Sequence, residues 1–173
     1  MNDIREREKT YKVVGPTVLV DVAGITDIPA KVDTGADTSA IWASNINMSK
    51  DGILSFTLFS PKSPMYTGEI IKTSEYRIKV VRSSHGDEQI RYRVKLPVCI
   101  SGVEFETTFT LADRTRNHFP VLIGRHTLEN QFVVDVSKEA SYRKPQKSPE
   151  LNRELRDNPY EFHQKYFKRK EQK

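Results

Sequence analysis

The sequence has almost no cysteine and no long apolar stretch. Its 173 residues include a single cysteine, Cys99, which has no partner for a disulfide within the chain. A lone thiol fits a reducing compartment, so we expect a cytoplasmic protein. No apolar run reaches the roughly 20 residues of a membrane-spanning helix, and the charged residues 1–9 lack the apolar segment of a secretory signal. We therefore expect a soluble protein without a membrane partner.

Motifs for metals and nucleotides are also missing. The four histidines are scattered, with no His-Glu-x-x-His pattern and no second cysteine beside Cys99. The chain has no Gly-x-x-x-x-Gly-Lys-Ser/Thr loop to hold phosphate groups. We therefore expect neither zinc nor ATP nor any other cofactor.

Positive charge is concentrated near the C-terminal end. Of the 28 Lys and Arg and the 23 Asp and Glu, residues 138–173 hold 11 and 6, which leaves 17 of each sign for residues 1–137. The body is neutral and the basic excess belongs to an appendage. The body also lacks a base-reading motif or an interleaved row of aromatic side chains, which argues against nucleic acid as a partner.

Alternating apolar segments separated by turn residues predict an all-β domain over residues 11–137, after a charged leader at 1–10. A polar connection at 44–63 should carry one strand, and a short helix should follow residue 124. The expected strands occupy residues 17–22, 28–32, 53–59, 69–81, 90–100, 105–111, 121–124 and 131–136. Such a set of short strands favours a partly closed barrel.

The basic C-terminal extension, 138–173, is expected to be helical. Ser148-Pro149 and Asn158-Pro159 each combine an N-cap residue with a proline suited to the first helical position. They predict helices over residues 149–156 and 159–169.

One segment places a carboxylate directly after a strand, in the order Asp33, Thr34, Gly35. Gly35 lets the backbone fold beneath Asp33 so that N–H groups can point at the carboxylate, and the Thr34 hydroxyl can brace it. An acid held in this way can serve as a reagent. Asp, Thr and Gly are also common turn formers, so the segment taken alone is more often a structural turn.

A second segment, from Phe119 to Arg125, is an apolar strand that ends in Gly124-Arg125. Together the two segments resemble the retropepsin-like aspartic peptidases. In that family Asp-Thr-Gly-Ala is followed, far downstream, by two apolar residues and then by Gly and Arg. The likeness extends over residues 13 to about 136 and is closest to a bacterial subfamily often labelled ATP-dependent zinc proteases. It implies a retropepsin-like partly closed β-barrel with one short helix.

The resemblance also implies amide hydrolysis by a water held between two aspartates. Two carboxylates about 3 Å apart cannot both be ionised, so one acts as general base and its protonated twin as general acid. The chain has one Asp-Thr-Gly, so the resemblance requires a homodimer with Asp33 from each subunit. Thr34 would bond across the twofold axis, Gly35 would bind the backbone of a peptide or protein substrate, and Ala36 and Gly124 would support the loop.

Further contacts implied by the resemblance support this loop and the dimer. Asp37 and Arg125 would form an ion pair that holds the loop against the short helix. We expect loss of Arg125 to destabilise the dimer and abolish activity. The terminal strands of retropepsins interleave between subunits, which makes residues 11–14 and 131–136 candidate dimer contacts.

Two further groups are candidates for substrate contact. Ser84, His85, Gly86 and Asp87 form the tip of a hairpin that lies, in chain order, where retropepsins carry a flap, although an ordinary exposed turn explains this polar tip equally well. Arg114 presents a fork that matches a carboxylate, with loop solvation as an equal alternative. Members of the subfamily are often linked with ligases that add amino acids to peptides, so acidic peptide tails are candidate substrates.

A non-catalytic dimeric module that binds a peptide or protein is the competing function. The intact Asp33, Thr34 and Gly35 favour the peptidase, because binding alone does not require paired acids.

Overall fold

A computed structural model describes residues 10–82, 88–139 and 149–166 of the chain. The chain divides into two compact units, residues 1–142 and 143–173. Among the described residues, no helix has both the length and the apolar character needed to cross a bilayer.

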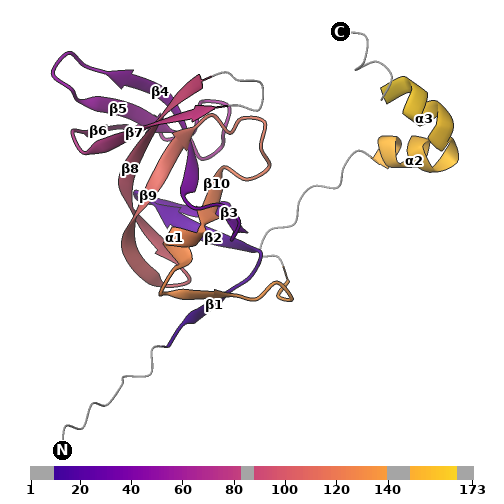
Figure 1. Ribbon diagram of the computed structural model, residues 1–173, viewed down its shortest axis with the longest axis horizontal. Coiled ribbons are helices and arrows are strands. Elements are labelled where there is room, and N and C mark those ends of the chain that lie inside the picture. The colour runs from indigo at the N-terminus through magenta and orange to yellow at the C-terminus, as the bar shows by residue number, and fades with distance from the viewer. Residues whose placement is uncertain (1–9, 83–87, 140–148, 167–173) are drawn as a thin grey trace, which may run out of the picture. The chain divides into compact units, whose positions relative to one another are not determined.

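Six strands of the first unit close into a barrel (Figure 1). Pairing between the first and last strands of the ring closes it, so the expected all-β barrel is confirmed and its ring is complete. Around the ring, the order is β10 (Val121–Gly124), β3 (Ile25–Asp33), β2 (Thr17–Val22), β8 (Glu88–Ile100), β9 (Val103–Ala112) and β4 (Ser39–Met48).

Alternation along the strands builds the core. In β2, Val18, Val20 and Val22 are buried while Leu19 is exposed, as expected when successive side chains point to opposite faces of a sheet. The largest side chains that are fully buried include Phe56, Phe59, Phe109, Ile28 and Ile41. Trp42 packs against this core, and its ring meets that of Phe59 edge to face with centroids 6.2 Å apart.

Two further strands, β5 (Leu54–Leu58) and β6 (Ile70–Thr73), continue the sheet beyond β4. The expected polar connection at 44–63 is wrong in its first part, since β4 runs on to Met48 and pairs with β5. Cross-strand hydrogen bonds stabilise these polar residues in a strand, because the Ser44 hydroxyl lies 2.9 Å from that of Thr57.

β7 (Tyr76–Arg82) and β8 form a hairpin whose tip lies outside the described residues. The expected single extended run over 69–81 is divided between β6 and β7. The Thr73 hydroxyl accepts the backbone N–H of Glu75 at 2.9 Å, which turns the chain between the two strands.

A small parallel pair joins β1 (Lys12–Val14) to β11 (Phe132–Val134), just after the short helix α1 (Arg125–Leu128). Val14 and Phe132 point into the core. Tyr11, Val13 and Val133 lie on the solvent side and are 43%, 45% and 50% exposed.

The second unit contains two helices, α2 (Pro149–Asp157) and α3 (Pro159–Tyr166). The expected helix starts at both prolines are confirmed, and the Asn158 side chain caps α3 by accepting the N–H of Glu161 at 3.2 Å. Glu154 of α2 and Lys165 of α3 form an ion pair at 2.6 Å. Residues 167–169, where α3 was expected to continue, lie outside the described part of the chain.

Candidate active site

The candidate site is built where β10 passes between β3 and β4. On one side β10 runs parallel to β3, with Gly124 opposite Asp33, and on the other it runs antiparallel to β4, with Val121 opposite Ile41. The segment that joins β3 to β4, residues 33–38, therefore has to cross the end of β10. We call this segment the Asp33 loop.

Gly124 lies directly beneath that crossing. A Cβ atom added to Gly124 would lie 2.6 Å from the backbone carbon of Thr38 and 2.9 Å from the carbonyl oxygen of Ala36. Its backbone is extended, with φ of −85°, so the glycine is needed for space and not for its conformational freedom. Only a residue without a side chain lets the Asp33 loop close over β10.

The Asp33 carboxylate is half-buried at the end of β3. Its Oδ1 accepts the backbone N–H of Gly35 at 3.1 Å, and its carbonyl oxygen accepts the N–H of Ala36 at 3.2 Å. These bonds fold the loop back under the acid, as the glycine and the short turn predict. Oδ2 has no hydrogen-bond partner among the described residues, and the neighbouring Thr34 and Gly35 are exposed.

Asp37 and Arg125 meet at the far end of the loop. Arg125 Nη2 lies 2.6 Å from Asp37 Oδ1. The backbone joins the same two segments, because the N–H of Arg125 donates to the carbonyl of Ala36 at 2.8 Å and that of His126 to the carbonyl of Asp37 at 3.1 Å. The loop is thus bonded to the start of α1 by both side chain and backbone.

A chain of buried hydroxyl groups, not identified from the sequence, lies behind the loop. Ser39 Oγ accepts the N–H of Gly124 at 3.0 Å and lies 2.6 Å from Thr127 Oγ1, which is 2.9 Å from Thr107 Oγ1. Ser39 and Thr127 are almost fully buried. Buried hydroxyls usually have partners, but the sequence around Thr127, between His126 and Leu128, gives no signal of its burial.

Arg114 lies between β9 and β10, where its Nε donates to the carbonyl of Phe119 at 2.9 Å. Burial lowers the pKa of the Arg114 guanidinium, with a further contribution from the charge of Arg91. This bond holds the segment that leads into β10, and contact between Arg114 and a substrate stays a prediction. The expected flap residues Ser84, His85, Gly86 and Asp87 lie outside the described residues.

The residues that the structure brings together are thus Asp33, Thr34, Gly35, Ala36, Asp37, Gly124 and Arg125. One carboxylate with a free oxygen on an exposed loop can accept a proton from water, and a second acid is needed to donate one to a carbonyl oxygen. Within the described part of the chain, no three His, Cys, Asp or Glu side chains are grouped so as to hold a metal ion.

Several known proteins are similar to this chain. A protein of unknown function (DUF785) from Legionella pneumophila shares the fold with a TM-score of 0.59 and 21% identity, over 76% of this chain and 98% of that one. Probable alpha-L-glutamate ligases from Shewanella pealeana and Shewanella halifaxensis are each 30% identical over 118 residues, or 66% of this chain. The chain spans about a quarter of the length of these ligases, 26% of each.

A family model for the retropepsin-like aspartic endopeptidase RimB matches residues 13–145. The match includes the whole barrel, the Asp33 loop and the Gly124-Arg125 segment. The chain therefore belongs to the RimB-like family of retropepsin-like aspartic endopeptidases.

Proposed function

We propose that this protein is a cytoplasmic aspartic peptidase that hydrolyses peptide bonds with two Asp33 carboxylates, one from each subunit of a homodimer. The observation that carries the proposal is the position of Asp33. It ends β3 opposite Gly124, its Oδ1 is engaged by its own loop, and its Oδ2 is free beside exposed Thr34 and Gly35. An aspartate that only stabilises a turn does not need a second carboxylate oxygen left free beside exposed residues.

The two carboxylates would divide the work of hydrolysis. The ionised Asp33 removes a proton from water, whose oxygen attacks the carbonyl carbon, while the protonated Asp33 of the second copy donates its proton to the carbonyl oxygen. Collapse of the tetrahedral intermediate breaks the C–N bond: the amine takes the proton that the first Asp33 removed from water, and a hydroxyl of the intermediate returns its proton to the Asp33 of the second copy. The products are a carboxylic acid and an amine, with one water consumed.

The small β1–β11 sheet offers a surface for the second copy. Tyr11, Val13 and Val133 expose apolar area there, next to a parallel pair that is joined to no further strand among the described residues. Pairing of these edges with those of another copy would bury this area. Thr34, at the exposed tip of the Asp33 loop, would then face its counterpart.

Acidic peptide tails are the proposed substrates. The relatives are named as ligases of glutamate, and roughly three quarters of each ligase lies outside the matched segment. A hydrolase segment joined to a ligase is suited to removing what the ligase adds. The tip residues Ser84, His85, Gly86 and Asp87, together with Arg114, are the candidates for substrate contact.

The test compares the wild-type protein with Asp33→Asn on a mixed library of acidic and neutral peptides between about pH 4 and pH 8, where carboxylate pairs titrate. Products are read by mass spectrometry. We expect cleavage by the wild type alone. If neither protein cleaves while both are folded dimers, the peptidase fails and the dimeric binding module takes its place.

A further inference from the structure

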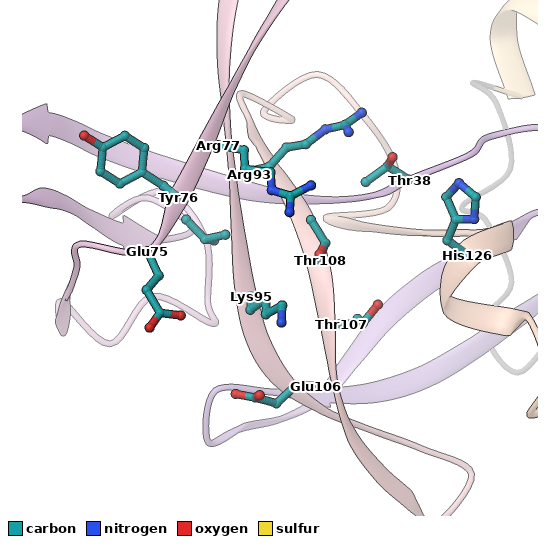
Figure 2. Close-up of a pocket in the computed structure, with 11 residues that line it drawn as sticks. Thr38, Glu75, Tyr76, Arg77, Arg93, Lys95, Glu106, Thr107, Thr108 and His126 are labelled. Carbon is teal, nitrogen blue, oxygen red and sulfur yellow. The ribbon is translucent and has the colours of Figure 1, made fainter.

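A hollow beside the Asp33 loop holds a group of cations (Figure 2). Its volume is about 570 Å³, and it is lined by residues of β7, β8 and β9 together with Glu75, Thr38 and His126 of α1. Arg77, Arg93 and Lys95 supply its positive charge. Figure 2 shows both guanidinium groups on the side toward Thr38, with the carboxylates of Glu75 and Glu106 on the other side. We call this hollow the Arg93 cavity.

Strand register forces the cations together. Arg77 of β7 and Arg93 of β8 are direct cross-strand partners. Partners in an antiparallel ladder point to the same face, and Lys95 follows Arg93 by two positions, so all three share one face. Like charges directly opposite each other destabilise a hairpin. An anion bound between Arg77 and Arg93 would replace their repulsion with attraction to the anion.

Arg93 also lacks an acceptor that its burial calls for. Its Nε is buried and has no hydrogen-bond partner among the described residues. Within the same part of the chain, Arg77 and Lys95 form no ion pair, although Glu75 and Glu106 also line the cavity. A buried N–H without an acceptor is unfavourable, so a ligand that offers an acceptor to Arg93 Nε would be stabilised there.

The Arg93 cavity adjoins the Asp33 loop. Thr38, in its wall, is the last residue of the Asp33 loop, and Thr107, also in its wall, bonds Thr127 of the hydroxyl chain behind Gly124. An extended peptide lying across Asp33 would therefore pass the mouth of the cavity and could place a side chain in it.

We propose that the Arg93 cavity is a carboxylate-binding subsite that selects an acidic side chain of the peptide. The planar forks of Arg93 and Arg77 match the two oxygens of a carboxylate, and Lys95 adds a point charge. The inference rests on the proposed function, because only a peptide held at Asp33 brings its side chain to Thr38. Phosphate has the same oxyanion chemistry, so the test separates the two sources.

Binding is measured by calorimetry on full-length Asp33→Asn, which removes turnover. The ligands are a peptide of about eight glutamates, the matching glutamine peptide and inorganic phosphate. We expect the glutamate peptide to bind more tightly than the glutamine peptide. Adding Arg93→Gln should weaken binding of the glutamate peptide roughly 10- to 100-fold, as for a lost charged hydrogen bond, and leave the glutamine peptide unchanged.

Lys79→Gln is the matched control, because it removes one positive charge, as Arg93→Gln does. Lys79 is an exposed residue of β7 that does not line the cavity. Equal weakening by Lys79→Gln and Arg93→Gln would overturn the subsite, as would phosphate binding without a preference for glutamate. If Arg93→Gln does not fold, Arg77→Gln, at an exposed position, decides in its place.

Cleavage assays separate this inference from the proposed function. If the wild type cleaves peptides with no preference for glutamate over glutamine, the subsite is wrong and the peptidase stands. If the wild type cleaves nothing but binding of the glutamate peptide depends on Arg93, the subsite stands and the peptidase is wrong.

Discussion

Arg125 Nη2 lies 2.6 Å from Asp37 Oδ1, although the side chain of each residue is 60% exposed. An ion pair so open to water adds little to the stability of a single chain, typically about 0–1 kcal/mol. Together with two backbone hydrogen bonds, it holds the Asp33 loop against the start of α1. The consequence of losing the pair should therefore appear in assembly and catalysis before it appears in unfolding.

Arg125→Ala should change the free energy of unfolding of the monomer by less than about 1 kcal/mol, yet destabilise the dimer and abolish peptide cleavage. Urea unfolding, analytical ultracentrifugation and a cleavage assay measure the three effects. Arg116→Ala, at an exposed position, controls for the loss of one cation. An Arg125→Ala protein that stays dimeric and fully active would contradict this role.

Gly124→Ala should destabilise the barrel by about 1–3 kcal/mol or more, because its Cβ would be forced against backbone atoms that cannot move aside. The closest of these is the carbon of Thr38, at 2.6 Å. Gly15→Ala is the control, since its Cβ would approach no atom closer than 3.3 Å. Thermal or urea unfolding of both variants tests the claim, and equal losses would refute it.

Thr127→Val should cost about 1–3 kcal/mol of unfolding free energy, because it keeps the shape of the side chain but removes the hydroxyl between Ser39 and Thr107. Thr110→Val is the matched control, as Thr110 is buried but its hydroxyl has no hydrogen bond to a described residue. Urea unfolding compares the two. If Thr110→Val costs as much, the hydroxyl chain is not the cause.

Ser137→Ala should raise the pKa of Asp135. The side chain and then the backbone N–H of Ser137 bond the carboxylate and hold its pKa below the ordinary 3.8. A lowered folded pKa adds stability that is present above pH 3.8 and is lost as the pH falls through the folded value. The variant should lose the share of this pH-dependent stability that comes from the Ser137 hydroxyl, while the backbone N–H of residue 137 remains.

NMR titration of the side-chain carboxyl carbons measures the effect. Asp113 is the internal control, because Thr115 lowers its pKa in the same way and is unchanged by the substitution. An Asp135 pKa that does not move in Ser137→Ala would show that the Ser137 hydroxyl does not lower it.

The local patterns of the sequence were enough to predict most elements. Apolar patterns predicted β2, β3, β5, β8, β9 and β10, and the Asn158-Pro159 pair predicted the start of α3. These signals work because the period of a strand and the chemistry of a helix cap depend only on neighbours in the chain. The polar residues at the end of β4 were misread, since their stabilising partners belong to β5.

The sequence by itself determined that the chain contains an all-β domain with one Asp-Thr-Gly segment and one Gly-Arg segment. Only the tertiary structure decided that Gly124 lies beneath Thr38, that Ser39 bonds Thr127, and that Arg77 faces Arg93. The physical reason is strand register, which sets contacts between residues far apart in the chain and leaves no trace in the spacing of either strand alone.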